Sequence, residues 1–459
     1  MQWTIRLETT TAWGEVQTFE VGRLERRVIG VAAHEIGLML EEAKALLAEL
    51  QRRIVQTQID EQVMCERVCS DCLRVRSIRD QRTRVLQTLF GTVRVAAPRI
   101  KLCSCVDKGQ FNDVSFSPLS DLLPGRCTPE LLHLQAELGA RHSFRESSRI
   151  LATFLPCSPP NHASVRNRLH RVAEELQAEE STPIVTPSEP DSARASDPGI
   201  VVVIDGAHIR AAPGYQTRHV DVTVGKVEAP GYQCRRFALA PAGTETPLAH
   251  IRGALAAQGW RPNVPVTVIS DGEAALPELV RRATGSQVTH ILDWWHISMR
   301  VRHAEQALQG VYALNPVHQA GLDMVSYRLS RVRHLLWNGY HDEASRELFG
   351  LRHLASEAVY LNGENLRASV IRFISHCADL RSYLDNNETS LIDYGSRYRA
   401  NKPISTSRAE GCVDEIANAR MAKRRRMRWS PRGAHRVATV RAAVLDGRLT
   451  AKQLLAKAT

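Results

Sequence analysis

The chain has 459 residues, of which 43% are hydrophobic and 24% charged. This is a globular composition that allows about two to four domains and excludes a wholly disordered or collagen-like chain. The 60 basic and 49 acidic side chains give a net charge of +11. The sequence shows neither a long apolar run that would span a membrane nor a secretory signal at its start. We therefore expect a cytoplasmic protein whose ten cysteines are thiols or metal ligands rather than disulfides.

The N-terminal region, residues 1–63, contains one strongly periodic segment. Its apolar residues recur at heptad spacing and predict a helix over about 32–63. The seam is short, so it fits a contact between two chains or a local core contact equally well. Its members are Ile36, Leu40, Ala43, Leu47, Leu50 and Ile54.

Cysteines are concentrated in residues 64–127. Cys69 and Cys72 form a Cys-x2-Cys pair, Cys103 and Cys105 form a Cys-x-Cys pair, and a predicted β-hairpin lies between them. Two such pairs can make a tetrahedral thiolate site, and this chemistry suits structural Zn²⁺ in a zinc-ribbon-like module. Cys65 is a further candidate ligand, and unligated thiols are the alternative.

Residues 128–178 read as three helices. Thr128-Pro129 is predicted to open the first with a cap and a first-turn proline, and Ser143 to cap the second through a Ser-x-x-Glu capping box. The third is expected over 163–176. Such a triplet is either a plain helical bundle or a helix-turn-helix, and beside the basic and cysteine-bearing segments we favour the DNA-binding alternative. The expected exposed DNA-contacting side chains are Ser164, Arg166, Asn167 and Arg168.

Residues 179–199 hold four prolines, four serines and five acids, so we expect a linker. After the linker the pattern predicts three strands, then helix, strand, helix and strand. Residues 294–400 read as nearly all helix, and a last helix is expected to begin near Ser407 and to continue through a basic tract. The predicted strands are 200–204, 219–224, 236–240, 264–269 and 288–292, and the helices between the last three strands are 247–258 and 273–282.

Two of the buried strands are predicted to end in an aspartate followed by glycine, at Asp205 and Asp271. A single such pair is typically a turn. Two such ends, on the first and fourth predicted strands, bring carboxylates to one edge of the sheet, where they suit a hard divalent cation such as Mg²⁺. The last helix offers a third carboxylate at Glu410, with Asp414 and Glu415 as alternatives on the same helix.

Much of the excess positive charge lies between residues 420 and 436, which contain no acid. Such a tract is either a solvated helix face or a contact for DNA phosphates. The side chains expected to contact DNA are Lys423, Arg424, Arg425, Arg426 and Arg428, with Arg420, Arg432 and Arg436 in the same tract.

The order of strands and helices, with Asp, Asp and Glu at these places, looks like the ribonuclease-H-like core of DDE transposases and integrases. Several transposase superfamilies insert a helical domain before the glutamate and carry Cys or Asp, two residues, then His after the fifth strand. Here that motif is Asp293-Trp-Trp-His296. The amino-acid sequence of residues 292–300, 420–429 and 440–447 resembles the ISKra-type family of bacterial insertion-sequence transposases. The resemblance covers essentially the whole chain.

The resemblance implies a transposase that binds terminal inverted repeats and target DNA, with at least two protomers when DNA is bound. Asp205, Asp271 and Glu410 would hold two Mg²⁺ or Mn²⁺ ions, one activating water or a 3′-hydroxyl and one stabilising the leaving oxygen. Asp293 and His296 are expected to support this catalytic site, and their alternative role is a strand-end hydrogen bond that braces the sheet. The rival functions are a metal-dependent nuclease without strand transfer and a non-catalytic zinc and helix-turn-helix DNA-binding regulator.

The predicted fold is multidomain α+β: a ribonuclease-H-like α/β core with an all-α insertion, preceded by a zinc-ribbon-like module and a helix-turn-helix. The expected divisions are 1–63, 64–127, 128–178, the linker 179–199, the first part of the core at 200–300, the helical insertion at 301–400, and the closing helix with the basic C-terminal region at 401–459.

Overall fold

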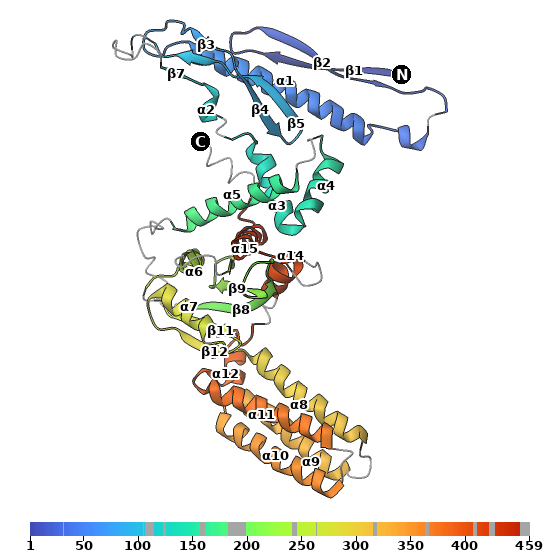
Figure 1. Ribbon diagram of the computed structural model, residues 1–459, viewed down its shortest axis with the longest axis vertical. Helices are drawn as coiled ribbons and strands as arrows, with labels where there is room; N and C mark the ends of the chain where they lie inside the picture. Colours follow the sequence, from blue (N-terminus) through green and yellow to red (C-terminus); the bar gives the residue numbers. More distant parts are fainter. Residues whose placement is uncertain are drawn as a thin grey trace. The chain divides into compact units, whose positions relative to one another are not determined.

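The computed structural model shows a mixed α/β protein with two compact units, Met1–Ala173 with Gly447–Thr459, and Glu174–Asp446 (Figure 1). None of its described helices is both long and apolar enough to cross a membrane. The structure describes residues 1–30, 32–103, 105, 114–122, 125–156, 161–181, 199–240, 246–262, 264–314, 319–362, 367–406, 411–421 and 427–449.

The first unit begins with an antiparallel hairpin that we did not predict, β1 (Gln2–Thr10) and β2 (Val16–Glu25). The 3-10 turn η1 (Ala33–Glu35) follows, and then the long helix α1 (Leu40–Arg67). The predicted start of that helix at residue 32 was wrong. Ile36 precedes the helix and is 75% exposed, so the predicted seam does not run along one helix.

A small β module follows α1. The predicted hairpin is confirmed as β4 (Thr83–Thr88) and β5 (Gly91–Ala96), and β3 (Ile78–Asp80), β6 (Arg99–Lys101) and β7 (Ser115–Phe116) form a second sheet. The short helix α2 spans Leu119–Leu122. Strand alternation turns one face of the hairpin towards α1. The shared core consists of Val55, Ile59, Leu86, Val93, Val95, Ala97 and Leu119.

The three predicted helices are α3 (Pro129–Arg141), α4 (Phe144–Phe154) and α5 (His162–Ser181). The Ser143 hydroxyl caps α4 by accepting the Glu146 N–H at 3.1 Å, which confirms the serine half of the predicted capping box. Thr128 holds the N-cap position of α3 without a side-chain capping bond. Helix α5 continues past residue 178, so the predicted start of the linker at 179 was wrong.

The last turns of α5 belong to the second unit. Glu174 forms ion pairs with Arg432 and Arg436, and Glu180 pairs with His250. Residues 179–181 were assigned to the linker from their composition, and the Glu180 contact stabilises them as the end of the helix.

The second unit is built on a five-stranded mixed sheet in the order β10-β9-β8-β11-β12. β8 pairs antiparallel with β9, β9 pairs antiparallel with β10, and β8, β11 and β12 run parallel. All five predicted strands and both intervening helices are therefore present. They are β8 (Ile200–Arg210), β9 (His219–Glu228), β10 (Arg235–Leu239), α6 (Thr246–Ala256), β11 (Val266–Ser270), α7 (Ala275–Thr284) and β12 (Thr289–Leu292).

Alternation along β8 separates two hydrophobic cores. Ile200, Val202 and Ile204 pack with apolar residues of α6 and α7 on one face. Val201 and Val203 pack on the other face, in a core that continues into the helical domain. Because both faces are covered, the strand reads as one continuous apolar run.

The helical domain is a set of four long helices followed by two short ones (Figure 1). Each of the four packs against two of the others. Their facing sides continue the core that begins under β8 and β12. The elements are α8 (Trp294–Leu314), α9 (Gln319–Trp337), α10 (His341–Asn362), α11 (Arg367–Asn386), η3 (Glu388–Ser390) and α12 (Tyr394–Arg399).

The C-terminal part of the second unit differs from the single helix that we predicted. A π-helical turn, η4 (Asp414–Asn418), leads into α14 (Ala419–Met421). Around Trp429 the chain is extended and bridges to Ala211. A separate helix, α15 (Pro431–Leu445), packs on β10, capped by the Ser430 hydroxyl and with proline in its first turn. The Ser430-Pro431 pair is a helix-start signal that the sequence interpretation missed.

Candidate active site and metal-binding cysteines

Asp205 and Asp271 lie at the same edge of the second unit's sheet. Asp271 directly follows β11, and Asp205 lies two residues beyond Val203, which pairs with Ile269 of β11. The prediction that the first strand ends at Asp205 was wrong, because β8 runs on to Arg210 as a two-stranded ribbon with β9. Asp205 therefore lies where the parallel part of the sheet stops and the ribbon begins.

The charge of Asp271 acts on the Asp205 carboxylate. Burial raises the pKa of Asp205 first, and the neighbouring charge of Asp271 raises it further, although the Gly206 N–H donates to the Asp205 carboxylate at 2.7 Å and opposes the shift. Asp271 accepts the Glu273 N–H at 3.1 Å. Two negative carboxylates at a partly buried sheet edge raise the free energy of the fold unless a cation compensates their charge.

Glu273 is an acid that the sequence interpretation missed. Its carboxylate lies close to β8: a Cβ built on Gly206 would be 3.8 Å from Glu273 Oε2. The signal was its position two residues after Asp271, in an Asp-Gly-Glu sequence after a buried strand.

Asp293 is fully buried and accepts four hydrogen bonds. Two come from the first turn of α8: the Trp295 N–H at 2.9 Å and His296 Nδ1 at 2.9 Å. The other two come from Thr406, whose N–H donates at 2.9 Å and whose hydroxyl donates to the second carboxylate oxygen. Burial would raise the pKa of Asp293, but the bonds from His296 and Thr406 hold it below its usual range.

His296 hydrogen-bonds Asp293, and the charges of Asp205 and Asp271 also act on its ring. Burial would lower its pKa, but the Asp293 hydrogen bond and the charges of Asp293, Asp271 and Asp205 raise it. The structure thus brings together four of the five predicted catalytic residues. The fifth, Glu410, lies outside the described residues.

The alternative third acids point elsewhere. Glu415 forms an ion pair with Arg236 of the edge strand β10 at 3.3 Å, and Asp414 accepts a hydrogen bond from Asn418 on its own helix. In the part of the chain that the structure describes, Asp205 and Asp271 belong to no compact group of three or more His, Cys, Asp or Glu side chains.

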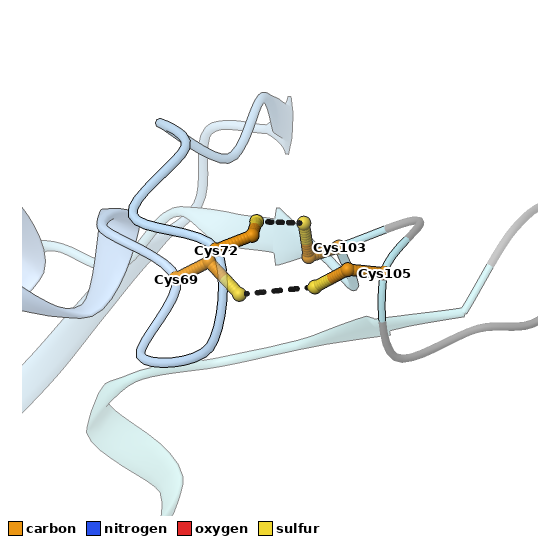
Figure 2. Close-up of side chains that lie close together, drawn as sticks. All are labelled: Cys69, Cys72, Cys103 and Cys105. Carbon is orange, nitrogen blue, oxygen red and sulfur yellow. Dashed lines mark hydrogen bonds between the residues drawn. The ribbon is translucent and has the colours of Figure 1, made fainter.

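Four cysteines of the first unit do form such a group. All four Sγ atoms lie within 4.8 Å of one another, with Cys69–Cys105 at 3.4 Å and Cys72–Cys103 at 3.3 Å (Figure 2). Tetrahedral zinc with Zn–S bonds of about 2.3 Å separates its sulfurs by about 3.8 Å, so the cluster can hold a metal such as zinc. Cys65 is exposed and outside the group.

The backbone around the cysteines favours thiolates. Hydrogen bonds from the Cys72 and Asp71 N–H groups, with help from Arg76, lower the pKa of Cys69 to about 6. The Cys105 N–H also lowers the pKa of Cys103, whereas side-chain hydrogen bonds with Cys103 and Cys69 raise the pKa of Cys105. Four thiolates this close therefore need a cation to ionise together.

The predicted DNA-contacting residues of α5 divide into two groups. Arg166 and Asn167 are exposed and contact each other, with Arg166 Nε 3.3 Å from Asn167 Oδ1. Ser164 and Arg168 are half-buried, so the expectation that all four are exposed was wrong. The Arg168 guanidinium donates to Gln135 and Gln87, which ties α5 to α3 and β4.

The basic tract is likewise mixed. Arg428 is exposed, whereas Arg420 is fully buried with its guanidinium 5.0 Å from the centre of the Trp429 ring. Arg436 pairs with Glu174. Lys423, Arg424, Arg425 and Arg426 lie outside the described residues.

Comparison with protein-family models gives no match for this sequence, and comparison with curated proteins gives no significant relative.

Proposed function

We propose that the chain is a DNA transposase of a bacterial insertion sequence, as its resemblance to the ISKra-type family implies. The observation that carries the proposal is the convergence of Asp205 and Asp271 at one sheet edge. At the same edge, Asp293 holds Thr406, which lies shortly before Glu410 in the chain.

The sheet supports a ribonuclease-H-like interpretation of this core. Three antiparallel strands are followed by two strands parallel to the first, the order that the resemblance requires. The helical domain leaves the core after β12 and returns at Thr406, between the second and third proposed acids. This agrees with an insertion before the glutamate.

Asp205, Asp271 and Glu410 are the residues that would hold Mg²⁺ or Mn²⁺. Bound there, two such ions would activate a hydroxyl and stabilise the leaving oxygen of a phosphodiester. The mutual repulsion of Asp205 and Asp271 fits a site that takes up hard cations. Asp293 occupies Nδ1 of His296, which leaves Nε2 as the ring atom for a substrate phosphate.

Other parts of the chain fit DNA binding. Arg166 and Asn167 are exposed on α5, and Arg428 is exposed beside α15. The four cysteines would hold a structural zinc ion that stabilises the β module. Joining two element ends to a target needs more than one active site, so we infer a homo-oligomer on DNA.

The test is cleavage and joining of the element's own end sequences with Mg²⁺ or Mn²⁺. Asp205→Asn and Asp271→Asn are compared with Asp221→Asn, which alters an exposed acid of the neighbouring strand β9. We expect Asp205→Asn and Asp271→Asn to lose both cleavage and joining. Asp221→Asn should keep both activities. Cleavage without joining would favour the nuclease, and specific binding without cleavage would favour the regulator.

A further inference from the structure

The helical domain makes direct contact with the turn that carries Asp271. The Tyr383 hydroxyl, on α11, donates to the Asp271 carbonyl oxygen at 2.7 Å, although 112 residues separate the two in the chain. The Arg300 guanidinium of α8 covers the Tyr383 ring, 4.0 Å from its centre. The hydroxyl is therefore held in place from two helices.

The residue after Asp271 is also in close contact with Asn387, which directly follows α11. Gly272 has φ of +92°, and a Cβ there would come 2.8 Å from Asn387 Oδ1 and 2.9 Å from Leu292 Cδ1. Asn387 is itself fixed, because its amide donates to the Tyr383 carbonyl at 2.8 Å. Only glycine fits this turn, both for its backbone angle and for the space that Asn387 leaves.

A third contact involves Ser270, the residue before Asp271. His290, on β12, bridges two hydroxyls: its Nε2 lies 2.9 Å from Ser270 Oγ and its Nδ1 lies 2.7 Å from Ser390 Oγ. Ser390 belongs to η3 and is buried. The helical domain thus contacts the chain before, at and after Asp271.

We propose that the helical domain positions the Asp271 carboxylate, with Tyr383 as the main positioning residue. The inference rests on the proposed function, since it takes Asp271 as a metal ligand. Because the Tyr383 bond fixes the Asp271 peptide plane, it also fixes the direction in which the side chain leaves the backbone. Removing a hydrogen-bond partner of a ligating side chain typically lowers metal affinity about 10–100-fold, and a bond to the backbone of the ligand should act near the lower end of that range.

The test compares Tyr383→Phe with Tyr394→Phe. The Tyr394 hydroxyl makes a similar buried bond from the same domain, to the Leu292 carbonyl at 2.8 Å. Both variants lose one hydroxyl and one carbonyl partner, so a merely structural role predicts similar losses of thermal stability and nothing more. The measurements are Mn²⁺ affinity by titration, the Mn²⁺ concentration for half-maximal cleavage, DNA affinity and melting temperature.

We expect Tyr383→Phe to weaken Mn²⁺ binding about tenfold and to raise the Mn²⁺ concentration for half-maximal cleavage equally, with DNA affinity unchanged. Tyr394→Phe should stay within about twofold of wild type. Ser390→Ala, which removes the His290 bridge, should shift Mn²⁺ affinity in the same direction as Tyr383→Phe and serves if that variant fails to fold.

Equal Mn²⁺ affinities in wild type, Tyr383→Phe and Ser390→Ala would overturn the inference while leaving the proposed function standing. If wild type binds Mn²⁺ through Asp271 but does not cut DNA, the proposed function fails. The Mn²⁺ affinities of the variants would then still support or overturn the positioning role of Tyr383. A wild type that does not bind Mn²⁺ in an Asp271-dependent way would overturn both.

Discussion

The Thr406 N–H donates to the Asp293 carboxylate at 2.9 Å, although 113 residues separate them. Beside it, the Trp294 N–H donates to the Ile404 carbonyl at 3.1 Å. The chain therefore leaves for the helical domain and returns from it at the same point of the sheet edge. The buried Asp293 carboxylate connects the segment that enters the helical domain with the segment that returns from it.

We expect Thr406→Val to destabilise the second unit. The substitution keeps the backbone donor but removes the hydroxyl donor to a buried, charged acceptor, a loss of about 1.5–3 kcal/mol. Denaturant unfolding measures it. Thr284→Val is the control, because the Thr284 hydroxyl bonds carbonyls near the end of its own helix, and it should cost about 0.5 kcal/mol or less. Equal losses in the two variants would contradict the role given to Asp293.

The Asp293–His296 pair should make stability depend on pH. The pKa of His296 is raised above 6.5, so its stabilising contribution is complete below pH 6.5 and is lost as the pH rises through the raised value. The pKa of Asp293 is lowered below 3.8, so its contribution is present above that pH and is lost in stronger acid. The free-energy difference between wild type and His296→Gln should therefore be largest near pH 5.5 and smaller at pH 9. A difference that does not change between these pH values would mean that the pair does not carry charge.

Zinc removal should unfold the β module of the first unit. We expect about one zinc ion per chain by elemental analysis, lost in Cys69→Ser together with a cooperative thermal transition. Cys65→Ser is the matched control, since Cys65 lies outside the cluster and should keep both the metal and the transition. Full zinc content in Cys69→Ser would show that the ligand set is wrong.

Two neighbouring arginines of α5 should behave differently. Arg168→Ala removes the guanidinium that bonds Gln135 and Gln87, so it should lower stability. Arg166→Ala alters an exposed side chain and should leave stability within about 0.5 kcal/mol while weakening DNA binding. Melting curves and a DNA titration at fixed salt separate the two. The opposite pattern would exclude α5 as a DNA-contacting helix.

The sequence was most informative where burial is continuous. The apolar runs before Asp205 and Asp271 predicted two buried strands. In the structure these strands are β8 and β11, which pair in parallel. The continuation of β8 to Arg210 was missed, although alternating Ala207 and Ile209 are both buried and carried the signal. The β1–β2 hairpin was missed because few of its side chains are buried.

Other features depend on tertiary contacts that a sequence pattern does not contain. The bonds of Thr406 to Asp293 and of Tyr383 to Asp271 join residues more than a hundred positions apart. Arg168 was predicted to be an exposed DNA contact, and Arg420 was placed in a basic tract that faces either solvent or DNA. In the fold, the Arg168 guanidinium donates to Gln135, and the Arg420 guanidinium lies over the Trp429 ring.

The most direct test of the account is strand transfer itself. Wild type and Asp271→Ala are incubated with Mg²⁺, labelled element ends and a target plasmid, and joined product is counted while DNA binding is measured in parallel. The account predicts metal-dependent joined product from wild type, and none from Asp271→Ala at equal DNA binding. Joined product from Asp271→Ala at the wild-type level would contradict it, because the carboxylate at the centre of the site would then be dispensable.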